Sequence, residues 1–302
     1  MAWKSIADLL SDQGEVALLG APMEAGSVTP GRCDLAPETV RRALRRFSTY
    51  DVETGRSLDL ALADHGDVPV QGLMPADGFA PIRDAVSRCT GAHALTLLIG
   101  GNNAVTRPAA HGLGPGLDSV GLITLDAHFD MRGTEDGPMN GNPVRCLIED
   151  GLPGRNICQI GLAPFANTVE MHRDARAAGA STWTIRQCLG QGIEAIIDEA
   201  LARLAHVEAV IVDFDIDVID RGQLPGAPGA RPGGMPVAMF FAAARRLAAE
   251  PKVGLVDLTE YDPSLDVAEI SALTAGRWVC EILAGYDSRA CAEPAAPAGI
   301  GR

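Results

Sequence analysis

Positive charge is scarce in this sequence, which has 25 lysines and arginines against 39 aspartates and glutamates. The resulting net charge of −14 makes nucleic acids and anionic membrane surfaces poor partners. No apolar stretch is long enough to cross a bilayer, and the first residues lack the apolar core and cleavage site of a signal peptide. These absences exclude the membrane and secreted classes from our expectation.

Paired cysteines are missing as well. The seven cysteines form no CxxC pair, and most of them lie in apolar contexts. This distribution is typical of reduced, buried thiols, so we expect a cytoplasmic protein without disulfides.

Short apolar runs alternate with helical patterns, which predicts βαβ units and a mainly parallel sheet. Strands are expected at residues 16–20, 58–62, 93–99, 120–125, 156–161, 180–185, 208–212 and 253–258. Helices are expected at residues 37–44, 79–89, 143–149, 193–204, 235–249 and 267–283. With no linker or repeat in sight, we expect one α/β domain over residues 1–291 and a mobile tail over residues 292–302.

Three metal-capable side chains follow the apolar run at residues 120–125. Asp126, His128 and Asp130 occupy alternate positions, and a strand projects alternate residues to one side. Two carboxylates and an imidazole packed together repel and lose hydration unless a cation lies between them. The alternative is a polar loop without metal.

A second acidic stretch follows the apolar run at residues 209–212. Asp213, Asp215 and Asp217 alternate with apolar residues, so three acids share one face of a buried strand. Two such strand ends indicate a carboxylate-rich site with one histidine. This donor set suits Mn²⁺ and contains too much oxygen for a structural zinc site.

Four strand ends therefore carry polar residues toward one edge of the sheet. The other two are Gly100-Gly101-Asn102-Asn103 and Thr259-Glu260. In a parallel sheet, ligands bind beyond the carboxyl ends of the strands, so we expect the functional site there.

At this point the chain resembles the ureohydrolase family of arginases, agmatinases and formiminoglutamases, over about residues 18–284. The family's Asp-Ala-His-x-Asp motif is present at residues 126–130, and its Phe-Asp-x-Asp-x-x-Asp motif at residues 214–220. The Glu after the family's last strand matches Glu260. The Gly-Gly-x-His motif is the departure, because Asn103 stands in place of the histidine. The fold that this resemblance implies is a three-layer α/β/α domain with a central parallel sheet.

The resemblance also implies two Mn²⁺ ions that share Asp126 and Asp215. His128 and Asp217 would complete the protein ligands of one ion, and Asp130 would bind the other.

Two residues at this site depart from the family pattern. Asn103 would be a neutral, single-donor ligand to the second ion, so we expect that ion to be weakly held or absent. Asp213 is an extra acid, and we expect it to lie beside the ligands rather than to bind metal.

The chemistry that the resemblance implies is attack by a metal-activated water on the carbon of an amidine or guanidine. Asp130 is expected to orient that water, and Glu260 to pair with the cationic end of the substrate. The loop with Asn140 and Asn142 is expected to contact the substrate. Asn140 stands where arginases use a histidine to relay protons, so another acid or a water must do this here.

Two arginines bear on the choice of substrate. Arg132 follows the first metal motif, and Arg231 lies on another loop of the same edge; a fixed guanidinium there would repel a basic tail and bind a carboxylate. Either arginine could instead be an ordinary surface residue. An amidine with two carboxylates, N-formimino-L-glutamate, fits best, and its hydrolysis is a step of histidine breakdown.

Two alternatives stay open. One is a hydrolase of arginine, N-hydroxyarginine, agmatine or a guanidino acid; the other is a non-catalytic subunit of ureohydrolase type. By analogy with the family we also expect a homo-oligomer.

Overall fold

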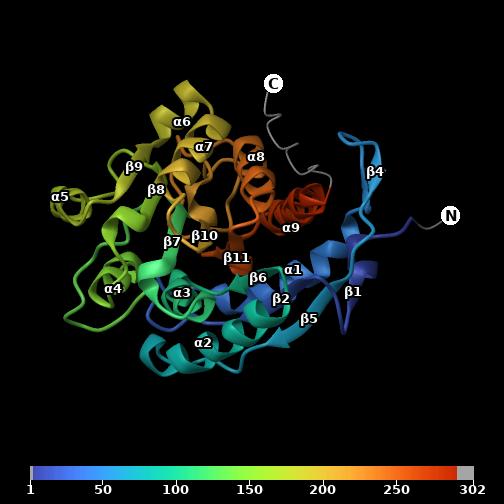
Figure 1. Ribbon diagram of the computed structural model, residues 1–302, viewed down its shortest axis with the longest axis horizontal. Helices are drawn as coiled ribbons and strands as arrows, with labels where there is room; N and C mark the ends of the chain where they lie inside the picture. The colour runs from blue at the N-terminus through green and yellow to red at the C-terminus, as the bar shows by residue number, and fades with distance from the viewer. Residues whose placement is uncertain (1–2, 291–302) are drawn as a thin grey trace, which may run out of the picture.

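A parallel β-sheet forms the centre of the structure, a computed structural model that describes residues 3–290 (Figure 1). Nine strands lie in the order β1-β5-β2-β6-β11-β10-β7-β8-β9, and each neighbouring pair is parallel. The strands are β1 Leu10–Ser11, β2 Val16–Ala21, β5 Leu62–Asp67, β6 Leu95–Gly100, β7 Val120–Leu125, β8 Ile157–Leu162, β9 Ser181–Thr184, β10 Ala209–Asp215 and β11 Val253–Thr259. A separate antiparallel ribbon pairs β3 (Tyr50–Asp51) with β4 (Arg56–Ser57).

Helices cover both faces of this sheet and give the three-layer α/β/α architecture that the resemblance implied (Figure 1). One apolar cluster joins the sheet to α1, α6, α7, α8 and α9, and a second joins its other face to α2, α3, α4 and α5. The helices are α1 Ala36–Ala43, α2 Pro75–Ala92, α3 Thr106–Leu113, α4 Pro143–Glu149, α5 Val169–Ala178, α6 Ile185–Gln191, α7 Ile193–Arg203, α8 Val237–Ala248 and α9 Ile270–Arg289.

The alternation of side chains along β10 shows how the layers arise. Val212 and Phe214 join the cluster under α8 and α9, while Ile211 joins the cluster on the α2 and α3 side. Asp213 and Asp215 follow Ile211 at period two, so the sequence places them on the α3 side of the sheet.

Several predicted elements differ from those of the structure. The strand expected at residues 58–62 is wrong: β5 begins at Leu62 and runs through the polar residues that follow. β1 is two residues long and pairs only with the start of β5, so much of β5 is exposed and keeps polar side chains. The helices α3, α5 and α6 were not predicted, because they have few large apolar residues to set a period.

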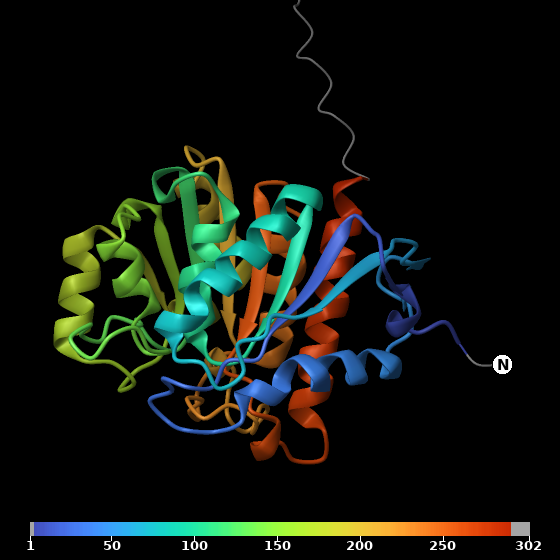
Figure 2. The same cartoon turned by 90° about the horizontal axis from the view of Figure 1, so that it is seen from below.

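The register of the four central strands aligns their carboxyl ends. Asp215 of β10 pairs with Thr259 of β11, Phe214 pairs with Leu125 of β7, and Leu258 pairs with Ile99 of β6. The loops that follow these strands gather at one edge of the sheet (Figure 2). The polar strand ends expected from the sequence therefore meet there.

The remaining expectations concern thiols, membranes and the tail. Six cysteines within residues 3–290 are free, and five of them are buried, as expected. None of the helices in that range is long and apolar enough to cross a membrane. The predicted tail, residues 292–302, lies outside the described residues.

Candidate metal centre and substrate cavity

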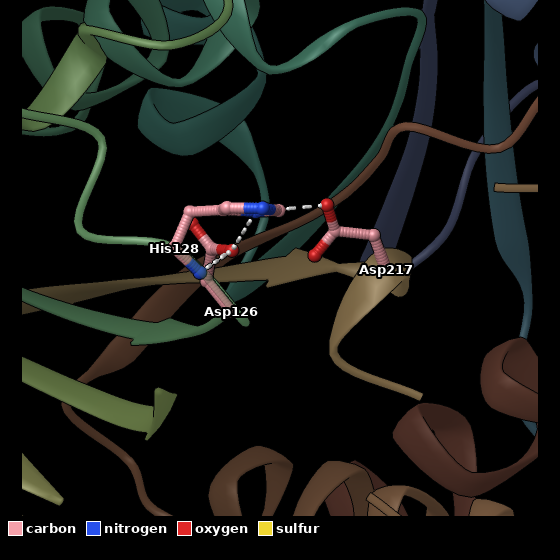
Figure 3. Close-up of side chains that lie close together, drawn as sticks. All are labelled: Asp126, His128 and Asp217. Atoms are coloured by element: carbon pink, nitrogen blue, oxygen red, sulfur yellow. Dashed lines mark hydrogen bonds and ion pairs between the residues drawn. The ribbon is translucent and has the colours of Figure 1, made fainter. Parts of the chain in front are cut away.

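The first part of the site joins the end of β7 to the turn after β10. His128 Nδ1 lies 3.1 Å from Asp217 Oδ2 and 3.4 Å from Asp126 Oδ1 (Figure 3). One ligand atom from each of these three residues lies within 4.8 Å of the others, close enough to hold one cation. The backbone N–H of His128 also donates to Asp126 Oδ1 at 2.7 Å, which fixes the imidazole above the strand end.

Charge explains why this group needs a cation. The Asp217 carboxylate raises the pKa of His128 to about 12, because its negative charge stabilises the adjacent imidazolium. Burial alone would raise the pKa of Asp217, but the charge of His128 lowers it overall. The proton on His128 thus supplies the positive charge that a metal ion would supply with a neutral imidazole.

The second part of the site surrounds Asn103, on the loop after β6. Its Nδ2 donates to Asp130 Oδ2 at 2.7 Å and lies 3.3 Å from Asp213 Oδ2 and 3.4 Å from Asp215 Oδ2. Its Oδ1 accepts a hydrogen bond from Thr106 Oγ1 at 2.6 Å. The predicted ligands Asp130 and Asp215 are therefore brought together around the residue that replaces the family histidine.

Burial makes this gathering of acids costly without a cation. It raises the pKa of Asp126 to about 6, and the pKa values of Asp130 and Asp215 well above their usual range. Asp126 Oδ2 is buried and has no hydrogen-bond partner within residues 3–290. Clustered carboxylates, an orphaned oxygen and one imidazole form the donor set of a hard divalent cation, so the residues fit the metal that the resemblance implied.

Two site residues have backbone conformations that non-glycine residues rarely adopt. Asp130 has φ of 52° and Glu260 has φ of 61°. The Asp130 carbonyl accepts from the Arg145 N–H at 3.2 Å, and the Glu260 N–H donates to Gly101 O at 2.9 Å. These contacts hold both carboxylates at the strand ends, and strain of this kind concentrates at functional sites.

Glu260 closes the site on the side of β11. Its Oε1 accepts hydrogen bonds from the Asn103 backbone N–H at 2.7 Å and from Asn140 Nδ2 at 3.0 Å. Burial raises its pKa to about 7. Asn140 also accepts from the Val28 N–H at 2.8 Å, so it ties the loop after β2 to the site.

A cavity opens above these groups. Its walls include His128, Asp130, Asp215, Asp217 and Glu260 on the metal side, and Asn140, Arg132 and Arg231 beside them. The structure thus places both predicted arginines, Asn140 and Glu260 on one cavity that adjoins the metal ligands. A concave site with a few converging polar groups is typical of small-molecule binding.

The two arginines differ in how they are held. Within residues 3–290, no hydrogen bond or ion pair engages the exposed guanidinium of Arg132, although its stem packs on Gly141. The Arg231 Nη1 donates to the carbonyl oxygen of Gly229 at 2.6 Å and to that of Ala230 at 3.1 Å. Arg132 is therefore free to bind an anion, and Arg231 is partly committed to its own loop.

Asn142 does not line the cavity. It is fully buried, its Nδ2 donates to the carbonyls of Gly133 and Gly137, and its Oδ1 accepts from the Met139 N–H. This placement does not support the predicted contact with substrate. The Asn142 amide satisfies backbone groups of its own loop, a structural role that could not be recognised from the sequence.

Asn167, on the loop after β8, was missed in the sequence. Its Oδ1 accepts from the Phe129 N–H at 2.8 Å and its Nδ2 donates to the Ala127 carbonyl at 2.9 Å. It therefore clamps the backbone on both sides of His128, and it also lines the cavity. Its position after the carboxyl end of another strand, β8, could have identified it from the sequence. The loop contains no charged residue, so this position was overlooked.

Comparison with known proteins agrees with this geometry. The sequence model of the arginase family matches residues 14–285. The chain belongs to the arginase family. The predicted resemblance is thereby confirmed, and the departure at Asn103 is a departure within that family.

Formimidoylglutamases are among the relatives of this arginase-family chain. That of Halalkalibacterium halodurans is 32% identical over 89% of this chain and 86% of its own length. The crystal structure of formimidoylglutamase from Bacillus subtilis superposes with a TM-score of 0.86 at 26% identity, over 94% of this chain and 92% of that one. Trypanosoma cruzi formiminoglutamase "with Mn2+2" has a TM-score of 0.87 at 20% identity, over 94% of this chain and 99% of that one, and shows the shared fold.

Proposed function

We propose that this chain hydrolyses N-formimino-L-glutamate to L-glutamate and formamide. The observation that carries the proposal is one cavity with a carboxylate-rich metal centre and Glu260 on one side and Arg132 and Arg231 beside them. The relatives named formimidoylglutamase support the same substrate. A cationic amidine needs an anionic partner, and a dicarboxylate tail needs cationic ones.

Glu260 is the partner for the amidine end. The hydrogen bonds from Asn103 and Asn140 to its Oε1 fix the carboxyl group at the cavity wall. An amidinium can donate to the other oxygen as a charge-assisted hydrogen bond, which is stronger than a neutral one. Because burial raises the pKa of Glu260 to about 7, a cationic substrate also favours its ionised form.

Arg132 is the partner for the carboxylate end. Its guanidinium is exposed, charged and without an ion pair within residues 3–290. A guanidinium binds a carboxylate through two parallel hydrogen bonds, and it repels the basic tail of arginine or agmatine. Arg231 can add a second contact, since it lines the same cavity.

Manganese is the metal that we propose for the centre. Asp126 and Asp215 would be shared by two ions, His128 and Asp217 would hold one, and Asp130 would hold the other. When bound, the metal lowers the pKa of water so that it can attack carbon near neutral pH. The Trypanosoma cruzi structure described with manganese supports this choice.

The residues of the chain supply the rest of the chemistry. Glu260 orients the amidinium, and Arg132 fixes the distance of the tail from the metal centre. Cleavage of the C–N bond leaves glutamate as an amine that needs a proton. Asn140 has no titrating proton to give, so a water or a metal-bound acid must supply it.

The test is a substrate panel with protein loaded with Mn²⁺. N-formimino-L-glutamate, arginine, N-hydroxyarginine, agmatine and guanidinobutyrate are compared at equal concentration, and glutamate, formamide and urea are measured. We expect glutamate and formamide in equal amounts from the first compound and little urea from the others. Urea from a guanidino compound without glutamate from the first would favour the guanidino-substrate alternative, and no turnover of any compound would favour the non-catalytic one.

The cytoplasmic location, the role in histidine breakdown and the homo-oligomeric state remain predictions that accompany this proposal.

A further inference from the structure

The environment of Asn103 Nδ2 does not satisfy the carboxylates around it. Three carboxylate oxygens, from Asp130, Asp213 and Asp215, lie within 3.4 Å of this one nitrogen. An amide nitrogen carries two hydrogens, so it can donate fully to only two of them. All four residues are buried, so these carboxylate oxygens have little contact with solvent.

Asp213 belongs to this group as fully as Asp215 does. Its Oδ2 lies 3.3 Å from Asn103 Nδ2, and the Oδ2 of Asp215 lies 3.4 Å from the same atom. Its Oδ1 accepts from Thr259 Oγ1 at 3.3 Å, which turns Oδ2 toward Asn103. A cation placed where the amide nitrogen lies would thus meet both carboxylates at about equal distance.

An independent observation points to a cation at this end of the sheet. Asp126 is 1% exposed, and its Oδ2 has no hydrogen-bond partner within residues 3–290. Its charge acts directly on Asp130, Asp213 and Asp215. A buried carboxylate oxygen without a donor, next to three acids that share one donor, is a deficit of positive charge.

The Thr106 hydroxyl is placed so that it could also pair with a rotated Asn103 amide. Its Oγ1 lies 2.6 Å from Asn103 Oδ1 and 3.1 Å from Asp257 Oδ2. A hydroxyl can both donate and accept, so Thr106 can donate to Asp257 and accept from the turned Nδ2. In that rotated orientation, Asn103 Oδ1 would face the three carboxylates and could serve as a fourth oxygen ligand.

We propose that Asp213 binds the second metal ion, on the Asn103 side, together with Asp130 and Asp215. The extra acid on β10 supplies a charged oxygen where the family histidine is absent, so the site loses a nitrogen ligand and gains a carboxylate. This revises the expectation that Asp213 lies only beside the ligands. The inference rests on the metal centre of the proposed function, and it concerns binding of Mn²⁺ alone.

The test compares Asp213→Asn with Glu281→Gln in metal-free protein titrated with Mn²⁺. Glu281 is a buried acid of α9 whose carboxylate pairs with Arg245 and Arg277, and it contributes no oxygen around Asn103 Nδ2. Calorimetry gives the affinity of each ion, and electron paramagnetic resonance distinguishes a coupled Mn²⁺ pair from a single ion. We expect Asp213→Asn to weaken the second ion at least ~10-fold and to reduce the coupled signal, while the first ion changes less than ~2-fold.

Glu281→Gln is expected to leave both affinities within ~3-fold of wild type, because it removes a buried charge without removing a ligand. Asp213→Ser, which shortens the side chain and keeps a polar group, serves if Asp213→Asn does not fold, and its expected result is the same. The proposal is overturned if the second ion binds Asp213→Asn as tightly as wild type, if Asp213→Asn and Glu281→Gln weaken it equally, or if wild type binds a single ion at millimolar Mn²⁺. Failure to hydrolyse N-formimino-L-glutamate would count against the proposed function and would leave these titrations unaffected.

Discussion

Replacement of Glu260 by glutamine in the metal-free protein removes a carboxyl group whose pKa burial raises to about 7. The hydrogen bonds from the Asn103 N–H and Asn140 Nδ2 can persist, because glutamine keeps an oxygen at the position of Oε1. The variant therefore differs from wild type mainly in having no proton to bind or lose.

The expected effect is a change in stability with pH. A pKa that rises from 4.5 to about 7 corresponds to about 3 kcal/mol, since each pKa unit is worth about 1.4 kcal/mol. Because the folded pKa is the higher one, the folded protein binds the proton more tightly than the unfolded chain. This stabilisation is fully present below pH 4.5 and is lost as the pH rises through about 7.

The assay is urea unfolding of both proteins in EDTA from pH 4.5 to 8. The free energy of unfolding of wild type, minus that of Glu260→Gln, should fall by about 3 kcal/mol over this range. In thermal melts the same difference is roughly 5–10 °C. Addition of Mn²⁺ should flatten the slope, because a nearby cation favours the ionised carboxylate.

Asp51→Asn is the control that should show no slope in this range. Burial acts to raise the pKa of Asp51, but its ion pair with Arg245 lowers it overall, below the ordinary value of 3.8, so its stabilisation is already complete above that pH and the corresponding difference should stay flat from pH 4.5 to 8. A Glu260 difference that stays flat, or that rises with pH, would refute the reasoning about burial of this carboxyl group.

Three further changes test the other parts of the site. Arg132→Ala should raise KM for a dicarboxylate substrate roughly 10- to 100-fold with little change in Tm, since its guanidinium makes no ion pair within residues 3–290; an unchanged KM would remove Arg132 from substrate binding. Asn103→His should increase the Mn²⁺ bound per chain at limiting metal, measured by dialysis and elemental analysis, because imidazole is a stronger ligand than an amide; two tightly held ions in wild type would contradict this view of Asn103. Asn167→Ala should weaken binding of the Mn²⁺ ion at His128 about 10-fold in calorimetry, because it frees the backbone on both sides of His128. An unchanged affinity would show that the backbone around His128 keeps its conformation without Asn167.

The sequence predicted the parallel sheet and the strands that carry the site, because both signals are local. An apolar run of six residues, as in β7, reads as a buried strand wherever it lies, and polar residues that end such a run mark its carboxyl end. β5 was not predicted in this way, because a strand that is exposed over much of its length needs no apolar run.

The side-chain partners could not be predicted in the same way. Arg132 and Arg231 look alike in sequence, yet only the folded loops show that Arg231 donates to its own backbone. Asn140 and Asn142 are two residues apart, and only the structure shows that one faces the cavity while the other is buried inside its loop. Asn167 was missed in the sequence because its loop contains no charged residue.

By itself the sequence determined which buried strands carry polar residues toward the site, because the period of a strand and the apolar runs are properties of neighbouring residues. Only the tertiary structure decided that β6, β11, β10 and β7 lie side by side in that order. That order brings Asp213 and Asp215 to the amide of Asn103, more than a hundred residues away, and leaves three carboxylates with one donor. A charge deficit of this kind depends on distances in space, which no local pattern records.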